Sequence, residues 1–324
     1  MLSRVAGNFF VINITMKRIK KIAKRFVSGL LILVILLVVL ISMRQNLKFE
    51  APYPDVRASS DSNVINRGRH IVFSQAHCAD CHSKQNADSL LELGIEPALS
   101  GGRLFDVGIA KIYTPNLTSD SVYGLGRRTD GEIARVIRYG VHANGNAVLN
   151  FMGFANMSDD DLTAVVSYLR TQKPVHEPVP SPEYSMMGKT VKAFLIKPVG
   201  PSHAVEKHIK PDSSIAYGEY IVTSTTNCAG CHTKRDLSGK FTGPLMAGGN
   251  NVEGLISPNL TPDSSSRIFG WSEQTFIERM RLGKINPASP MPWNSFKRMT
   301  DLELKAIYRY LKSIPAAKTP AVDE

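Results

Sequence analysis

The sequence lacks the motifs that most often identify an enzyme. It contains no glycine-rich nucleotide-binding loop, and its serine, histidine and acidic residues occur without a motif that links them into a hydrolase triad. It also lacks strand-like alternation of apolar and polar residues over any useful length. These absences argue against nucleotide-dependent and hydrolytic chemistry, and they favour a mainly helical protein.

Acidic residues are missing from the first 48 positions, which hold nine lysines and arginines. The rest of the chain carries 30 basic and 28 acidic residues and is nearly neutral, although the formal charge of all 324 residues is +11. A near-neutral body with few basic runs argues against binding of nucleic acid. The excess positive charge therefore belongs to the N-terminal segment.

That N-terminal segment has the pattern of a membrane anchor. A basic N-terminus over 1–25 precedes an apolar run over 26–43, which would form a helix about 27 Å long, enough to cross a slightly thin bilayer. No small-x-small cleavage site follows, so an uncleaved signal anchor is preferred to a cleaved signal peptide. Because positive residues stay inside, the sequence predicts a single pass through the cytoplasmic membrane, a cytoplasmic N-terminus and a periplasmic body after Arg44.

The start of translation has two candidates. Residues 1–15 lack the basic cluster, and Met16 directly precedes it. One hypothesis is that translation begins at Met16 and that residues 1–15 are not translated. N-terminal mass spectrometry of the native protein would distinguish the two starts.

Cysteine is scarce, and none of the 4 is spare. An exported protein usually uses cysteines in disulfides, but here all of them lie in two copies of Cys-x-x-Cys-His. This pentapeptide is the signature of c-type haem attachment: two thiols add to the two vinyl groups of one haem, and the histidine becomes the proximal iron ligand. A redox dithiol would not need the histidine, and a four-cysteine zinc site would leave both histidines without a role. We expect two covalently bound haem c groups, held by Cys78, Cys81, His82, Cys228, Cys231 and His232.

The rest of the chain repeats around these two motifs. A glycine lies ten residues before the first cysteine of each, at Gly68 and Gly218. A near-identical loop follows each motif, at 114–120 and 257–263. Each copy ends in a helical pattern of apolar residues behind a Ser/Thr-x-x-acid cap.

The repeat predicts an all-α fold of two tandem domains. Proline and basic residues are frequent between the copies, which favours an extended connector wrapped around the domains. The predicted closing helices span 159–171 and 301–313, the domains 60–172 and 212–318, and the connector 173–211.

Both halves resemble class I c-type cytochrome domains, and the tandem is similar to the di-haem and tri-haem cytochrome c subunits of membrane-bound alcohol and gluconate dehydrogenases. The resemblance covers about residues 60–318 and rests on the paired haem motifs, the Pro-Asn-Leu-Thr loops and the run from Met291 to Asp301. The chain departs from the three-haem subunits because it has two motifs, so no particular dehydrogenase partner is indicated. The resemblance also implies that the first and last helices of each domain cross closely, at the pairs Gly68–Tyr168 and Gly218–Tyr310.

The sixth iron ligand is clearer in the second half. Met291 lies between two prolines and matches the axial methionine motif of the family, and a thioether ligand raises the reduction potential. In the first half, an ungapped alignment from the closing helix places Leu149 opposite Met291. Met152 becomes the match if the loop is three residues shorter, although Gly153 stands where the family has proline. We prefer Met152, and the alternatives are Met157, His142 and an open iron site.

The resemblance also implies residues around the ligands. The carbonyls of Pro97 and Pro244 are expected to accept the second N–H of the axial histidines, which would orient the rings. Candidates for contacts with the haem propionates, with an ordinary loop role as the alternative, are Asn116, Asn259, Arg103 and Trp293.

These features predict an electron carrier with no catalysis of its own. The expected donor is a periplasmic dehydrogenase or a quinol-oxidising complex, and the expected acceptor is a soluble cytochrome or a terminal oxidase of a respiratory chain. The alternative is a di-haem peroxidase-like enzyme with one open haem, for which His142 is the nearby base. A haem-based sensor is disfavoured, because the predicted cytoplasmic side offers only residues 1–25.

Overall fold

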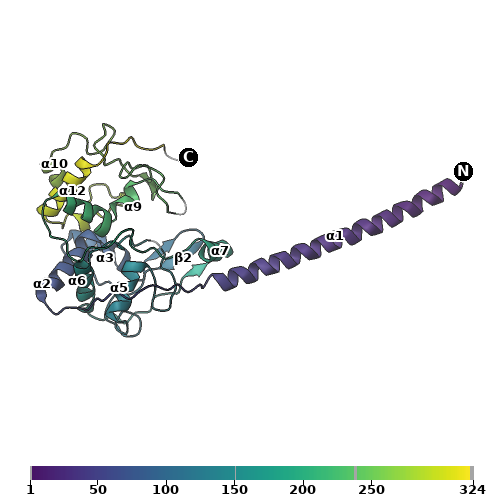
Figure 1. Cartoon of the computed structure of the whole chain (residues 1–324), viewed down its shortest axis with the longest axis horizontal. Coiled ribbons are helices and arrows are strands. Elements are labelled where there is room, and N and C mark those ends of the chain that lie inside the picture. The colour runs from purple at the N-terminus through teal and green to yellow at the C-terminus, as the bar shows by residue number, and fades with distance from the viewer. Residues whose placement is uncertain (1, 150, 237–238, 322–324) are drawn as a thin grey trace. The chain divides into compact units, whose positions relative to one another are not determined.

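The computed structural model describes residues 2–149, 151–236 and 239–321 of the chain. The described elements fall into two compact units. One unit contains α1 (Leu2–Arg44) and α7 (Met186–Phe194), and the other contains the remaining helices and the strands (Figure 1). The mostly helical fold expected from the sequence is confirmed.

Helix α1 contains a segment, Arg18–Arg44, that is apolar and long enough to cross a membrane, and its most apolar window of 18 residues has a mean hydropathy of 3.1. Only 6% of its most apolar window is buried. An N-terminal signal sequence has the same properties, so this segment is a candidate for either a membrane anchor or a signal.

Helix α7 lies within the connector that the sequence predicts to be extended. It packs against α1 in the same unit: the guanidinium carbon of Arg44 lies 5.1 Å from the ring centroid of Phe194, and Lys192 Nζ donates to Asn46 Oδ1 at 3.4 Å. No proline interrupts residues 183–197, so a helix can form there. The prediction of an extended connector is wrong for Met186–Phe194, which are helical.

The second unit contains two halves with a similar order of helices, and each half has one short helix that the other lacks. In each, a π-helical turn directly continues the first helix, and the Cys-x-x-Cys-His motif follows as a separate helical turn. The first half contains α2 (Ser62–His70), η1 (Ile71–Gln75), α3 (Cys78–His82), α4 (Ala87–Glu92), α5 (Asp130–Tyr139) and α6 (Asp159–Arg170). The second half contains α8 (Ile215–Tyr220), η2 (Ile221–Thr225), α9 (Cys228–His232), α10 (Glu273–Arg281), α11 (Trp293–Phe296) and α12 (Asp301–Ser313).

Short strands, which the sequence does not predict, join the loops of the second unit. They form an antiparallel sheet in the order β1-β2-β3, in which Phe105 pairs with Ile112, and a separate two-stranded pair of β4 and β5. Their bounds are β1 (Leu104–Asp106), β2 (Ala110–Tyr113), β3 (Glu183–Tyr184), β4 (Asn251–Val252) and β5 (Leu255–Ile256). Strands this short have too few residues to produce a recognisable alternation.

The first and last helices of each half cross at a glycine. A Cβ atom on Gly68 of α2 would lie 1.9 Å from the carbonyl oxygen of Ala164 in α6. A Cβ atom on Gly218 of α8 would lie 2.0 Å from the carbonyl oxygen of Ala306 in α12. In both halves the Cβ of the expected tyrosine partner would lie 2.9 Å away, so the predicted glycine–tyrosine contacts are confirmed. Only glycine allows two backbones to approach this closely.

The closing helices begin at the predicted caps. Ser158 Oγ accepts the amide of Asp161 at 3.2 Å, and Thr300 and Glu303 form a reciprocal capping box. Each half then buries its own apolar cluster, one around Phe73 and Leu162 and the other around Phe276 and Leu304. Each half therefore has a separate core.

A buried polar network joins the two halves. The carboxylate of Glu303, whose residue is only 2% exposed, lies 2.8 Å from His70 Nε2 and 3.4 Å from the guanidinium of Arg67. Arg67 also donates to both carboxylate oxygens of Asp161, at 2.8 and 2.9 Å. The hydroxyl of Tyr220 donates to the same carboxylate at 2.7 Å. These bonds connect α2 and α6 of the first half to α8 and α12 of the second.

Candidate functional site

Each Cys-x-x-Cys-His motif forms one short helical turn, α3 or α9. The residue before each turn has a left-handed backbone, with φ of 38° at His77 and 52° at Asn227. This conformation ends the preceding π-helical turn and starts a new one. Cysteines three residues apart lie on the same side of such a turn, with the histidine directly after them.

The four cysteines are free thiols. Burial raises the pKa of Cys78 to about 12 and that of Cys228 to about 11, and it also raises the pKa of Cys81 and Cys231. Burial therefore favours the neutral thiol at all four positions. Among the described residues, no group of three or more His, Cys, Asp and Glu side chains is arranged to hold a metal ion.

His82 and His232 have matching environments. Each is 8% exposed, and burial lowers the pKa of both imidazoles, which favours their neutral form. Nδ1 of His82 lies 3.0 Å from the carbonyl oxygen of Pro115, and Nδ1 of His232 lies 2.9 Å from that of Pro258. When Nδ1 donates to a carbonyl, Nε2 is left with its lone pair available, which is the state required of a metal ligand.

The prediction that Pro97 and Pro244 supply these carbonyls is wrong. The acceptors belong to the prolines of the two Pro-Asn-Leu-Thr loops, and the Pro244 carbonyl instead accepts the amide of Ala247 at 3.2 Å. The reason lies in a glycine with positive φ after each motif. The amide of Gly101 donates to the His82 carbonyl at 2.7 Å, and a Cβ on Gly101 would lie 2.5 Å from the Pro115 carbonyl carbon. This tight turn brings the loop onto the histidine, and the second half repeats it at Gly248.

Met291 lies at the edge of the second core. It is partly buried and packs against that core, and its carbonyl accepts the amide of Trp293 at 2.8 Å, at the start of α11. Its neighbour Trp293 donates from Nε1 to Ser289 Oγ at 3.0 Å, which steadies the loop that presents the methionine.

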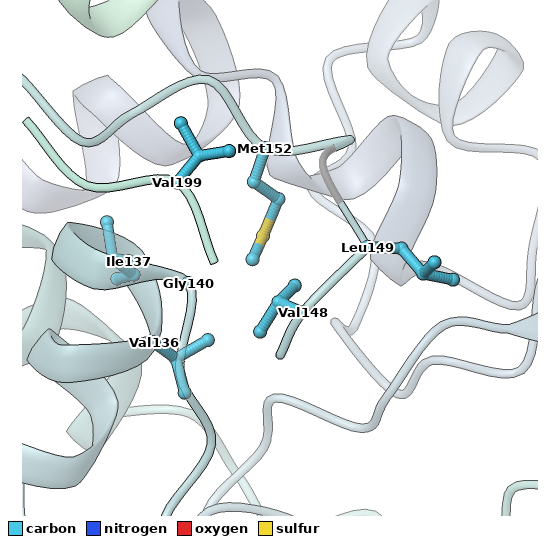
Figure 2. A pocket seen from close by; sticks show the side chains of 7 residues that line it. All are labelled: Val136, Ile137, Gly140, Val148, Leu149, Met152 and Val199. Carbon is cyan, nitrogen blue, oxygen red and sulfur yellow. The ribbon is translucent and has the colours of Figure 1, made fainter. Parts of the chain in front are cut away.

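Met152 lies in a small apolar pocket of the first half. Figure 2 shows its thioether directed between Val148 and Val199, beside Val136 and Ile137 of α5. The side chain of Leu149, the match in the ungapped alignment, also lines this pocket but points away from Met152 (Figure 2). Met152 is not part of the first core, whereas Met291 packs on the second, so the two halves differ at this position.

The other first-half candidates have different surroundings. Met157 is 1% exposed and belongs to the first core, just as Met299 is 2% exposed in the second. Both directly precede the cap of a closing helix, and this burial supports a packing role. His142 is exposed on a turn in which its amide donates to the Asn146 carbonyl at 2.9 Å.

The side chains of Asn116 and Asn259 hydrogen-bond the two Pro-Asn-Leu-Thr loops to neighbouring segments. Both residues are 2% exposed. The side-chain amide of Asn116 donates to the Val175 carbonyl at 2.8 Å, and that of Asn259 donates to the Ala317 carbonyl at 2.6 Å. Each therefore ties its Pro-Asn-Leu-Thr loop to the segment that follows the closing helix, and this supports the loop role over a contact with a propionate.

The remaining polar candidates differ in what they contact. Arg103 donates to the Asp80 carbonyl inside the first motif and lies over the ring of Phe105. Trp293 is stacked under Arg279, whose guanidinium carbon lies 3.7 Å from the ring centroid. Arg279 was missed by the sequence reasoning. The sequence separation between Arg279 and Trp293 does not predict their contact, because only the tertiary structure brings the two side chains together.

Helix α11 of the second half contacts the motif region of the first half. Ser295 Oγ donates to Asp80 Oδ2 at 2.9 Å, and Asn294 Nδ2 donates to Asp88 Oδ1 at 2.9 Å. Asp80 is part of the first Cys-x-x-Cys-His motif, whereas Ser295 lies four residues after Met291. The loop that carries the methionine of the second half is therefore hydrogen-bonded to the motif of the first.

Comparison with known proteins agrees with this geometry. Residues 215–315 match the cytochrome c family. The second half is therefore similar to a cytochrome c domain. Such a domain implies a covalently bound haem c, and the free thiol pair with its carbonyl-held histidine fits that group.

Relatives of known identity support the same family. The chain is 26% identical to the cytochrome c subunit of a quinone-dependent alcohol dehydrogenase from Gluconacetobacter polyoxogenes, over 79% of this chain and 57% of that protein. It is 25% identical to the cytochrome subunit of a fructose dehydrogenase from Gluconobacter japonicus, over 82% of this chain and 55% of that protein. It is 26% identical to a diheme cytochrome c from Cereibacter sphaeroides, over 77% of this chain and 86% of that protein.

The chain thus spans just over half the length of the two dehydrogenase subunits and most of the diheme cytochrome. The resemblance to cytochrome c subunits that the sequence indicates is confirmed.

Proposed function

We propose that this chain is a membrane-anchored cytochrome c with two haem groups that carries single electrons between two redox proteins. It would contain two tandem cytochrome c domains, at 60–172 and 212–318, separated by the connector at 173–211. The observation that carries the proposal is the duplicated arrangement of a free thiol pair and a histidine whose Nδ1 faces a proline carbonyl at 3.0 or 2.9 Å.

The hydrogen bonds around the two motifs support the proposal that the first half is also a cytochrome c domain. The carbonyl of His82 accepts an amide from Gly101 at 2.7 Å, and the carbonyl of His232 accepts one from Gly248 at the same distance. In both halves the backbone amide of the leucine that follows the Pro-Asn pair donates a hydrogen bond of 2.8 Å to a backbone carbonyl. Since the second half matches the cytochrome c family, a first half built on the same bonds is best explained as another copy.

The proposed ligands are divided between the halves. Cys78 and Cys81 would attach one haem and Cys228 and Cys231 the other, with the iron held by His82 and Met152 in the first half and by His232 and Met291 in the second. Haem c at these positions would supply a one-electron couple. The chain's part would be to hold the imidazole orientation through the Pro115 and Pro258 carbonyls, to offer a thioether as the second protein ligand, and to exclude water with the two apolar cores.

The short contact between the halves suits this role. Asp80 of the first motif accepts a hydrogen bond from Ser295, close in the chain to Met291. The buried network of Glu303, His70 and Arg67 holds the two halves together. Because these bonds fix the two halves relative to one another, redox groups held by the two motifs would exchange electrons without any movement of the halves.

The N-terminal helix is proposed to anchor the protein, with residues 26–43 crossing the cytoplasmic membrane once. The basic cluster before this run supports a cytoplasmic N-terminus and haem domains in the periplasm. A periplasmic dehydrogenase is the preferred electron donor, because relatives are cytochrome subunits of alcohol, fructose and gluconate dehydrogenases. A quinol-oxidising complex is the other candidate donor. A soluble cytochrome or a terminal oxidase of a respiratory chain is the proposed acceptor.

The experiment that tests the function is carbon monoxide binding to the dithionite-reduced holoprotein, combined with a haem count. Two haems that take up no carbon monoxide are expected, because every iron position would be filled by a side chain. A count of one haem would refute the two-haem proposal.

A di-haem peroxidase-like enzyme is the second candidate. Met152 lies in its own pocket outside the first core, and Gly153 follows it where the family has proline, so the first half is where an open iron position would occur. Carbon monoxide bound to one of two haems would favour this function over the electron carrier.

A further inference from the structure

Helix α7 has one packed side and one exposed apolar side. Gly188 and Ala193 are buried, whereas Met186 is 57% and Met187 66% exposed. Leu195, directly after the helix, is 64% exposed. Large apolar side chains gathered at this density on one short helix are unusual for a surface that faces water.

The position of α7 is set by its contacts within its own unit. It packs against the end of α1, where Arg44 lies over Phe194 and Lys192 donates to Asn46. Ile41, one turn before Arg44, is only 5% exposed, and it is the one buried residue among the described side chains of α1. Ile41 belongs to the apolar run 26–43 and lies about 3 Å along the axis from the end of that run.

We propose that α7 lies in the surface of the same bilayer that α1 crosses, with Met186, Met187 and Leu195 in the boundary between headgroups and acyl chains. The inference rests on the proposed membrane anchoring. Packing at the level of the last turn of the apolar run places α7 at the membrane–water boundary. The helix contains Lys189 and Lys192 and no acidic residue, which suits contact with phosphate headgroups.

The consequence is an attachment by two segments distant in the sequence. A single crossing helix is free to rotate about its axis, because nothing else fixes its azimuth in the bilayer. An interfacial helix packed on its end fixes that azimuth. The first unit is thus a composite membrane module, made from the N-terminal helix and a short helix of the connector.

The test is spin labelling of the full-length holoprotein in vesicles that contain zwitterionic and anionic phospholipids. Single cysteines are introduced as Met187→Cys in α7, Val34→Cys in α1 and Leu93→Cys in the second unit, and each is labelled with a nitroxide. Leu93 is the matched control, because it is also a large exposed apolar residue, at 74%. The unsubstituted holoprotein gives the background. The quantity measured is the collision rate of each label with oxygen, which concentrates in lipid, relative to that with a water-soluble nickel chelate.

The expected result is an oxygen-to-nickel collision ratio several-fold higher at positions 187 and 34 than at position 93. A lipid-like ratio at 34 with a water-like ratio at 187 would overturn the inference about α7 and leave the anchor intact. A water-like ratio at 34 would overturn the anchor itself. Low collision rates with both reagents at 187 would show a protein covering α7, which would also refute the proposal.

Discussion

Replacing Glu303 by glutamine tests the buried network between the two halves. Burial by itself would raise the pKa of the Glu303 carboxyl, but the bonds from His70 and the Thr300 amide and the charge of Arg67 outweigh burial and lower the pKa from 4.5 to about 2. This difference corresponds to about 3 kcal/mol of stabilisation of the folded state. The variant Glu303→Gln should therefore lower the free energy of unfolding by about 3 kcal/mol at neutral pH.

The effect has a defined pH dependence. Since the pKa is lower in the folded state, the stabilisation is fully present above pH 4.5 and is lost as the pH falls toward about 2. The difference between the native protein and Glu303→Gln should shrink over the same range. Glutamine can still complete the capping box with Thr300, so the loss of the cap does not confuse the comparison.

Guanidinium unfolding of the holoprotein in detergent is a suitable assay. The chain has 2 tryptophans, and both lie in the second half, where their fluorescence reports on the domain that contains Glu303. Glu219→Gln is the matched control, because Glu219 is exposed, and its replacement should change stability by less than about 0.5 kcal/mol. Equal effects of the two variants, or an effect of Glu303→Gln that does not vary with pH, would refute the reasoning.

Three further predictions concern the ligands and the packing. Met291→Leu and Met152→Leu should each lower the reduction potential of one haem and create one iron that binds carbon monoxide. An unchanged optical spectrum of Met152→Leu would show that another residue is the sixth iron ligand in the first half. Gly218→Ala should destabilise the second half by about 3 kcal/mol in thermal unfolding, whereas Gly131→Ala, whose Cβ would meet nothing closer than 3.6 Å, should change stability by less than about 1 kcal/mol. Asn259→Ala should cost about 1–3 kcal/mol and speed amide hydrogen exchange after the closing helix, and unchanged exchange there would argue against the loop role.

The sequence by itself determined the features that depend on short-range patterns. The Cys-x-x-Cys-His spacing placed two thiols and a histidine on one turn, because residues three and four apart always meet on a helix. Short-range patterns also predicted the helix caps at Ser158 and Thr300 and the apolar run 26–43. The glycines at 68 and 218 followed from the resemblance to a known family.

Tertiary structure decided what distant segments do to one another. The carbonyls of Pro115 and Pro258 lie beside histidines some 30 residues earlier in the chain, because a glycine with positive φ turns each loop back onto its motif. No local pattern in the sequence distinguishes these carbonyls from those of Pro97 and Pro244. The pairing of Glu303 with His70 joins positions 233 residues apart, so only the packing of the two halves creates it. A hydrogen-bond partner is chosen by distance in space, and in a chain folded from two similar halves that distance is fixed only when both cores have formed.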